Sequence, residues 1–92
     1  MSEVCGFSTE LWEKLGFKFE VNDWFEGGQI WYAEKEFGGL VFSLRINTHT
    51  SRTLAKIENI ERQKLGNHIV SEQDAIDWFS SKSDVFKKAC EE

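Results

Sequence analysis

LVFSLRIN, at residues 40–47, is the clearest strand signal in this chain. Its even-numbered positions are all large and apolar, whereas Ser43, Arg45 and Asn47 are polar. A strand places successive side chains on opposite faces, so this alternation predicts one buried face and one exposed face. We therefore expect residues 40–47 to form a strand of a sheet that is covered on one side.

Two pairs of adjacent glycines precede this strand, Gly27-Gly28 and Gly38-Gly39. Glycine adopts positive φ without steric cost, which suits the tight turns of hairpins. Residues 17–22 alternate between apolar and polar side chains, which predicts a strand that runs to about Phe25, and residues 29–37 lie between the two glycine pairs. Both segments are predicted to be strands, so the first three strands should form an antiparallel meander.

Residues 52–65 are ambiguous, because Ala, Lys, Glu, Gln and Leu favour a helix while the spacing of the apolar residues does not. A helix would place Ile60 well off the apolar stripe that starts at Leu54. We predict a fourth strand with an irregularity near Asn59, and a helix is the alternative.

Polar capping residues predict three short helices. Ser8 or Thr9 is placed to begin a helix over residues 8–15. Ser71 follows a turn predicted at Gly66-Asn67 and begins a second helix, and Ser83 or Asp84 begins a third. Hydroxyl groups at these positions can accept a hydrogen bond from a free amide in the first helical turn.

The predicted fold is α+β, with an antiparallel β-meander of three to four strands and short helices packed on one face. A chain of 92 residues should make a single compact domain, residues 1–92. Thirteen of these residues are Phe, Trp or Tyr, so the core is expected to be aromatic. No apolar run approaches the roughly 20 residues that a membrane span needs, so no membrane partner is expected.

The sequence offers no clear catalytic or metal-binding set. Cys5 and Cys90 lie near opposite ends and are predicted to be reduced thiols. With His49 and His68 they lack the close ligand spacing of structural zinc sites. We therefore expect no metal, no cofactor and no catalytic residue, and a small enzyme is the less supported alternative.

Basic residues gather in one segment of an acidic chain. The segment 45–64 holds five basic and two acidic residues, a net charge of +3, and the other residues hold six basic and fourteen acidic ones, a net charge of −8. Such a cluster can contact the phosphates of an RNA backbone or a partner protein, and the alternative is a solvated strand and loop. Free duplex DNA is not expected, because the whole chain carries −5. The candidate binding residues are Arg45, His49, Arg52, Lys56, Arg62 and Lys64.

Two tryptophans are candidate interface anchors. Trp24 falls in phase with the polar positions of its predicted strand, and Trp31 lies on the next strand. Exposed tryptophan often anchors protein interfaces. The alternative is that both rings are covered within the fold.

Residues 71–79, SEQDAIDWF, open a late amphipathic helix after a strand meander in a small acidic chain. In this layout the chain resembles phage-encoded anti-CRISPR proteins, particularly small inhibitors of the type I-F surveillance complex. The resemblance covers the whole chain in size and element order, and residues 71–79 in motif. It implies an inhibitor that binds protein subunits of the crRNA-guided complex and blocks target DNA hybridisation by steric and electrostatic occupancy.

The resemblance also implies contact with the guide RNA backbone as an additional feature, and a location in the cytoplasm of the infected bacterial host. A homodimer through a free sheet edge is a further expectation for a meander. The alternative function is an immunity protein or antitoxin that neutralises a basic nuclease toxin, because such proteins also bind by charge complementarity.

Overall fold

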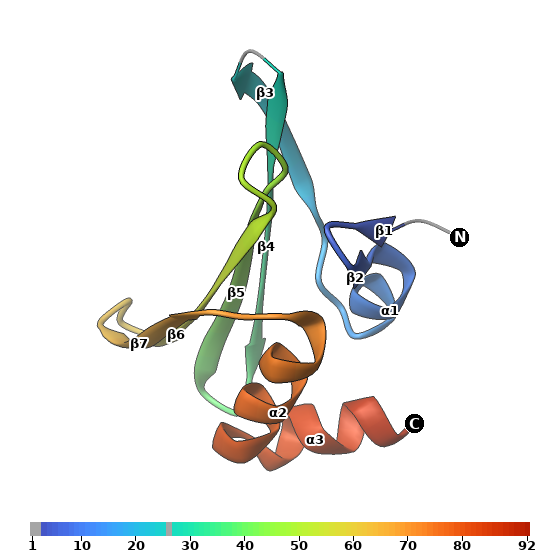
Figure 1. Ribbon diagram of the computed structural model, residues 1–92. Coiled ribbons are helices and arrows are strands. Elements are labelled where there is room, and N and C mark those ends of the chain that lie inside the picture. The colour runs from blue at the N-terminus through green and yellow to red at the C-terminus, as the bar shows by residue number, and fades with distance from the viewer. Residues whose placement is uncertain (1–2, 26) are drawn as a thin grey trace.

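A five-stranded sheet, a layer of helices on one side of it and a small two-stranded sheet of β1 and β2 make up the fold (Figure 1). The computed structural model describes residues 3–25 and 27–92, except for the side chains of residues 23–25. In chain order the elements are β1 (Glu3–Val4), β2 (Phe7–Ser8), α1 (Thr9–Lys14), β3 (Glu20–Phe25), β4 (Gly28–Phe37), β5 (Leu40–Asn47), β6 (Arg52–Asn59), β7 (Lys64–Ile69), α2 (Glu72–Lys82) and α3 (Asp84–Glu91).

The main sheet is an antiparallel meander in the order β3-β4-β5-β6-β7. This confirms the predicted α+β class, with five strands in place of the three or four expected. The predicted strand at residues 40–47 is β5, which lies at the centre of the sheet and pairs along its whole length with β4 and β6. β3 and β7 are the two edge strands.

The ambiguous segment 52–65 is extended and not helical, as predicted, but it is divided between two strands, β6 and the start of β7. β6 covers Arg52–Asn59, and its pairing with β7 shifts register between Ile57 and Glu58, close to the irregularity expected near Asn59. The chain then turns at residues 60–63. The Asn59 side-chain oxygen accepts hydrogen bonds from the backbone amides of Glu61 and Gln63, at 3.0 and 2.9 Å, which fixes the turn.

The turn predicted at Gly66-Asn67 is wrong, because both residues lie inside β7. Gly66 is needed for packing, because the Trp78 side chain lies directly over its backbone. A Cβ added to Gly66 would lie 3.2 Å from the Trp78 ring, so the side chain of α2 closes directly over the strand backbone. A glycine is required both in tight turns and where another part of the protein packs closely on a strand, so the sequence alone does not distinguish the two cases.

The N-terminal region differs from its prediction at one point. β3 begins at Glu20, three residues after the predicted start at Phe17. The Phe17 ring is buried and meets the edge of the Trp12 ring at 5.2 Å, so residues 17–19 cross from α1 to the sheet as irregular chain. Val21 on β3 is 43% exposed, so the predicted buried stripe does not continue along this edge strand.

All three predicted helices are present, and the structure places a serine at each cap, Ser8 and not Thr9 for α1, Ser71 for α2, and Ser83 and not Asp84 for α3. The hydroxyls of Ser8, Ser71 and Ser83 each accept a hydrogen bond from a backbone amide of the first turn, at 3.2 to 3.3 Å. These caps satisfy amides that have no partner within their own helix. The caps therefore set where α1, α2 and α3 start.

Aromatic rings fill the space between the sheet and the helices. Phe42 of β5 stacks on Phe79 of α2 with ring centroids 4.5 Å apart, and Phe86 of α3 meets both rings edge to face. Trp12 of α1 is fully buried and contacts Phe79 and Phe86. The core thus joins the three helices to one face of the sheet through ring contacts, which bury roughly 150–250 Å² per side chain.

Candidate binding surface

The face of the sheet away from the helices, which we call the open face, presents residues from all five strands. Side chains alternate along each strand, and the strand register places residues from neighbouring strands in rows across the face. The first row is Asn22, Ile30, Asn47 and Arg52; the second is Glu20, Tyr32, Arg45, Leu54 and Ile69; the third is Glu34, Ser43, Lys56 and Asn67.

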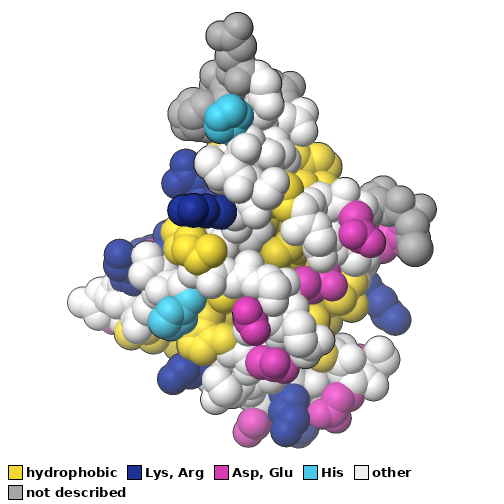
Figure 2. Space-filling model, viewed as in Figure 1, with side chains coloured by type: hydrophobic (Ala, Val, Ile, Leu, Met, Phe, Trp, Pro, Cys, Tyr) yellow, Lys and Arg dark blue, Asp and Glu magenta, His cyan; other side chains and the backbone are white. Residues whose placement is uncertain are grey.

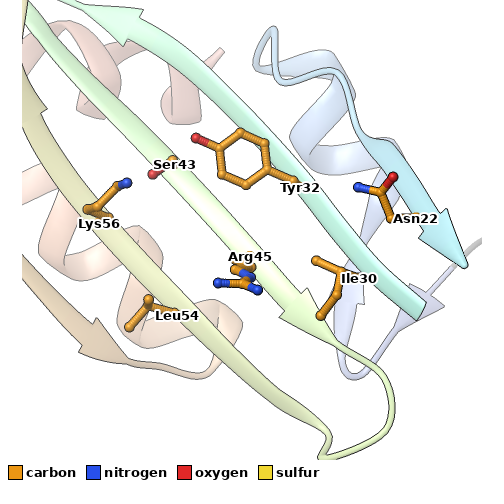
Figure 3. A pocket seen from close by; sticks show the side chains of 7 residues that line it. All are labelled: Asn22, Ile30, Tyr32, Ser43, Arg45, Leu54 and Lys56. Atoms are coloured by element: carbon orange, nitrogen blue, oxygen red, sulfur yellow. The ribbon is translucent and has the colours of Figure 1, made fainter. Parts of the chain in front are cut away.

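A hollow of about 260 Å³ lies at the middle of the open face (Figure 3). Its walls combine the Tyr32 ring and two aliphatic side chains with amide, hydroxyl and cationic groups. A second hollow, of about 270 Å³, extends the first toward the β5–β6 loop and shares Arg45 and Leu54 with it. The residues lining the first hollow are Asn22, Ile30, Tyr32, Ser43, Arg45, Leu54 and Lys56.

Three of the predicted basic binding residues come together on this face. Arg45 lines both hollows, Lys56 lines the first and Arg52 lines the second. Within the described part of the chain, the side chains of Arg45 and Arg52 have no acidic partner. The Lys56 ammonium has a partner in Glu58, at a long distance of 3.7 Å. Two of the three cations are therefore available to an anionic ligand.

The two loops of the sheet carry the next candidates. His49 is exposed in the β5–β6 loop, which lies so close to β4 that a Cβ added to Gly28 would come within 2.7 Å of the His49 Cβ. This loop borders the end of the open face that holds Arg52. Lys64 is exposed at the start of β7, at the other end of β6.

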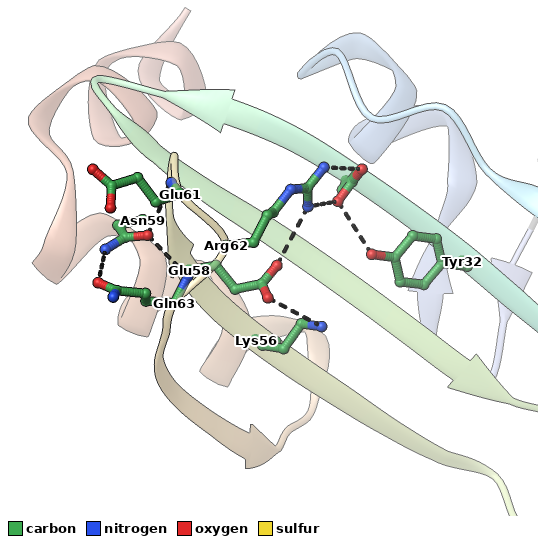
Figure 4. A network of polar contacts seen from close by, with 8 residues as sticks. Tyr32, Lys56, Glu58, Asn59, Glu61, Arg62 and Gln63 are labelled. Carbon is green, nitrogen blue, oxygen red and sulfur yellow. Dashed lines mark hydrogen bonds and ion pairs between the residues drawn. The ribbon is translucent and has the colours of Figure 1, made fainter.

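Arg62 differs from the other predicted binding residues, because carboxylates of this chain hold it (Figure 4). Its guanidinium donates to both carboxylate oxygens of Glu34, at 2.6 and 2.9 Å, and to Glu58 at 3.3 Å. Such a two-bond contact with a carboxylate is the geometry that Arg favours. Arg62 therefore ties the β6–β7 turn to β4 and β6, which is a structural role.

The same network sets the charge state of two neighbouring groups. The hydrogen bond from Arg62 lowers the pKa of the Glu34 carboxyl. Burial raises the pKa of the Tyr32 hydroxyl, and the nearby Glu34 charge raises it further. The Tyr32 hydroxyl donates to Glu34 at 3.2 Å. At neutral pH the network thus presents a neutral phenol beside an ionised and paired carboxylate.

We predict that Glu34→Gln lowers the stability of the fold at pH 7, and that this difference shrinks below about pH 4.5. The pKa of Glu34 in the folded state is below its ordinary value of 4.5, so the stabilisation by this carboxylate is present above pH 4.5 and is lost as pH falls through the folded-state pKa. Urea unfolding of both proteins from pH 7 to pH 3 measures the difference. A difference that stayed constant over this range would contradict the assigned role of the Glu34 charge.

Of the two tryptophans predicted as interface anchors, the structure describes the side chain of Trp31 only. Trp31 is half-buried on the helical side of the sheet, where its ring meets Phe19 at 6.0 Å and its indole NH donates to Gln29 at 3.0 Å. Its ring is thus part of the packing around the core. The side chain of Trp24 lies outside the described residues, so its prediction as an anchor stays a prediction.

Sequence reasoning missed the uncharged walls of the hollow, namely Asn22, Ile30, Tyr32, Ser43 and Leu54. Strand register brings Tyr32 opposite Arg45, and Arg45 opposite Leu54. The signal was present in the alternation of β4, since Ile30, Tyr32 and Glu34 share one parity. This alternation places Tyr32 beside Arg45 only once β4, β5 and β6 are aligned, and that alignment depends on the positions of the β4–β5 and β5–β6 turns.

Both cysteines are free thiols, as predicted. Cys5 is exposed, and burial raises the pKa of the half-buried Cys90 thiol. Among the side chains that the structure describes, no group of three His, Cys, Asp or Glu residues is arranged to hold a metal ion. No helix in residues 3–25 and 27–92 is long and apolar enough to cross a membrane.

Charge differs between the helices and one part of the sheet, the strands β5 to β7, whereas β3 and β4 are acidic like the helices. The helices α1, α2 and α3 hold seven Asp or Glu residues and four Lys residues, whereas the strands and loops from β5 to β7 hold five Lys or Arg residues and two Glu residues. Figure 2 shows Asp and Glu side chains gathered over the helices and several Lys and Arg side chains along the strand side of the molecule.

Searches for a matching protein-family model, a similar curated protein and a similar solved structure found no match.

Proposed function

We propose that the protein is a non-catalytic inhibitor that binds a type I-F crRNA-guided surveillance complex and blocks target DNA hybridisation by occupying its binding channel. The observation that supports this function is the contrast between the acidic helices and the basic segment from β5 to β7, whose Arg45, Arg52 and Lys56 lie on the open face. The target channel of crRNA-guided effectors is positively charged, so an acidic surface approaches it favourably. The protein would act in the cytoplasm of the infected bacterial host.

In this proposal the helical layer contacts protein subunits. Glu13 of α1, Asp77 of α2 and Asp84 of α3 are exposed, and the Asp77 carboxylate accepts a hydrogen bond from the side chain of Gln73. Exposed carboxylates of this kind pair with lysine and arginine of a partner without prior loss of an internal ion pair. Charge complementarity then speeds association and selects the partner.

The test is a gel-shift assay of target DNA with a purified type I-F surveillance complex. Excess protein is expected to abolish target binding and to co-elute with the complex. Glu13→Lys combined with Asp77→Lys should weaken inhibition, while Lys87→Glu, a matched change on exposed α3, should preserve it. Target binding that stays unchanged in excess protein would refute the proposal.

The acidic helices also favour a second candidate, an immunity protein or antitoxin that neutralises a basic nuclease toxin. A pull-down from the host lysate with the full chain as bait separates the two functions. Recovery of surveillance-complex subunits supports the inhibitor, and recovery of a single basic nuclease supports the alternative.

Size-exclusion chromatography of the same preparation measures whether the free edge of β3 or β7 supports a homodimer.

A further inference from the structure

Three basic side chains on the open face follow one another at a regular spacing. Arg52, Arg45 and Lys56 stand in the first, second and third rows, in that order along the strand axis. Rows on one face are two residues apart, so each step is about 7 Å. This step is comparable to the distance between successive phosphates in an extended single strand of nucleic acid. We call these three residues the cation row.

The hollow beside the cation row has the size and walls for a flat, partly polar ring. The Tyr32 ring, Ile30 and Leu54 supply apolar contact, and Asn22 and Ser43 supply hydrogen-bonding groups. In Figure 3 these side chains come from four neighbouring strands and surround the position of Arg45. An unpaired nucleobase has the same combination of an apolar face and polar edges, and it stacks on aromatic rings.

Acidic residues limit where an anionic strand can lie. Glu20 ends the second row at the β3 edge, Glu34 shares the third row with Lys56, and Glu58 follows Lys56 along β6. Arg62 pairs with both of these last carboxylates, so the cation row ends there. The available track runs over β5 and β6 from Arg52 to Lys56 and is about three phosphates long.

We propose that the open face binds single-stranded nucleic acid, with successive phosphates on the cation row and one unpaired base in the hollow against Tyr32. A single strand fits better than a duplex, because the base must leave its stack to enter the hollow. It also fits better than an acidic peptide, because carboxylate side chains leave the ring-sized hollow unfilled. This inference deepens the proposed function, on which the identity of the natural strand as a guide RNA rests.

Fluorescence anisotropy of the full chain with labelled octauridylate tests the inference. The affinity should fall with salt, with a slope of log K against log salt of about −2, since three phosphate contacts each contribute about 0.7 on single strands. Arg45→Ala should reduce the magnitude of the slope by about 0.7. Lys87→Ala, a matched change of an exposed base on α3, should leave it unchanged. Octathymidylate in a parallel titration shows whether the strand is RNA or DNA.

Tyr32 is the only tyrosine of the chain, so a ring-labelled sample places one NMR reporter in the hollow. Its ring signals should shift on addition of octauridylate. Tyr32→Ala should lose affinity on the order of tenfold, whereas Tyr32→Phe, which keeps the ring, should bind as the wild type does. Circular dichroism of each variant confirms that the sheet is intact.

Binding without salt dependence, an unshifted Tyr32 signal, or equal binding by Arg45→Ala would overturn the inference. Tighter binding of octaglutamate than of either oligonucleotide would assign the face to acidic peptides instead and would also overturn it. The assay contains no surveillance complex, so failure here leaves the inhibitor proposal standing. Conversely, oligonucleotide binding by a protein that does not inhibit target binding counts against the inhibitor proposal alone.

Discussion

Phe79→Ala is expected to lower the free energy of unfolding by about 3–5 kcal/mol. Phe79 is fully buried at the centre of the aromatic core, where its ring stacks on Phe42 at 4.5 Å and meets Trp12 and Phe86 at 6.2 and 5.4 Å. Its removal leaves a cavity between the sheet and two helices. Small domains have a total stability of about 5–15 kcal/mol, so this single change removes a large part of it.

Urea unfolding followed by tryptophan fluorescence measures this loss. Val85→Ala is the matched control, because Val85 lies in the neighbouring helix α3 and is 53% exposed. Its change should be within about 1 kcal/mol of wild type, as for most surface substitutions. A Phe79→Ala protein as stable as Val85→Ala would show that ring packing does not hold the helices on the sheet.

Glu72→Ala is expected to cost about 1–3 kcal/mol of stability. One carboxylate oxygen of Glu72, at the start of α2, accepts from the Ser8 amide at 2.6 Å and from the Trp12 indole NH at 3.0 Å. Trp12 is fully buried, so its NH would lose its partner in a place that water does not reach. For a domain of this size we expect a fall in Tm of roughly 4–8 °C per kcal/mol.

Thermal unfolding followed by circular dichroism measures this effect. Glu72→Gln retains one acceptor oxygen and should lose less stability than Glu72→Ala. Gln73→Ala changes the adjacent, exposed residue, whose side chain bonds only to Asp77 on the same helix, and should have little effect. Equal Tm values for Glu72→Ala and Gln73→Ala would rule out a stabilising role for the contact between α2 and the N-terminal segment.

Local sequence signals predicted most of the fold. The alternation at residues 40–47, the glycine pair at Gly38-Gly39 and the three capping serines each correspond to an observed element boundary or strand. The predictions were wrong at Gly66 and Phe17, where a contact with a residue elsewhere in the fold determines the local structure. Gly66 lies in a strand because Trp78 packs over it, and Phe17 leaves the strand pattern because its ring enters the core beside Trp12.

The candidate surface was predictable only in part, for a similar reason. Clustering of basic residues pointed to Arg45, Arg52 and Lys56, which share the open face. The same clustering included Arg62, whose acidic partner Glu34 is 28 residues away in sequence. The alternation of β4 indicates the face on which Tyr32 lies, but its place beside Arg45 follows from the pairing of β4 with β5.

Successive residues of β5 lie on opposite faces of the sheet, one in the core and the next on the open face. Phe42, Leu44 and Ile46 are buried under the helices, while Ser43 and Arg45 between them line the open face. Substitutions of Arg45, which is exposed, therefore change the proposed binding surface and leave the buried residues of β5 in place. An insertion of one residue in this strand would exchange the two faces and destroy both at once.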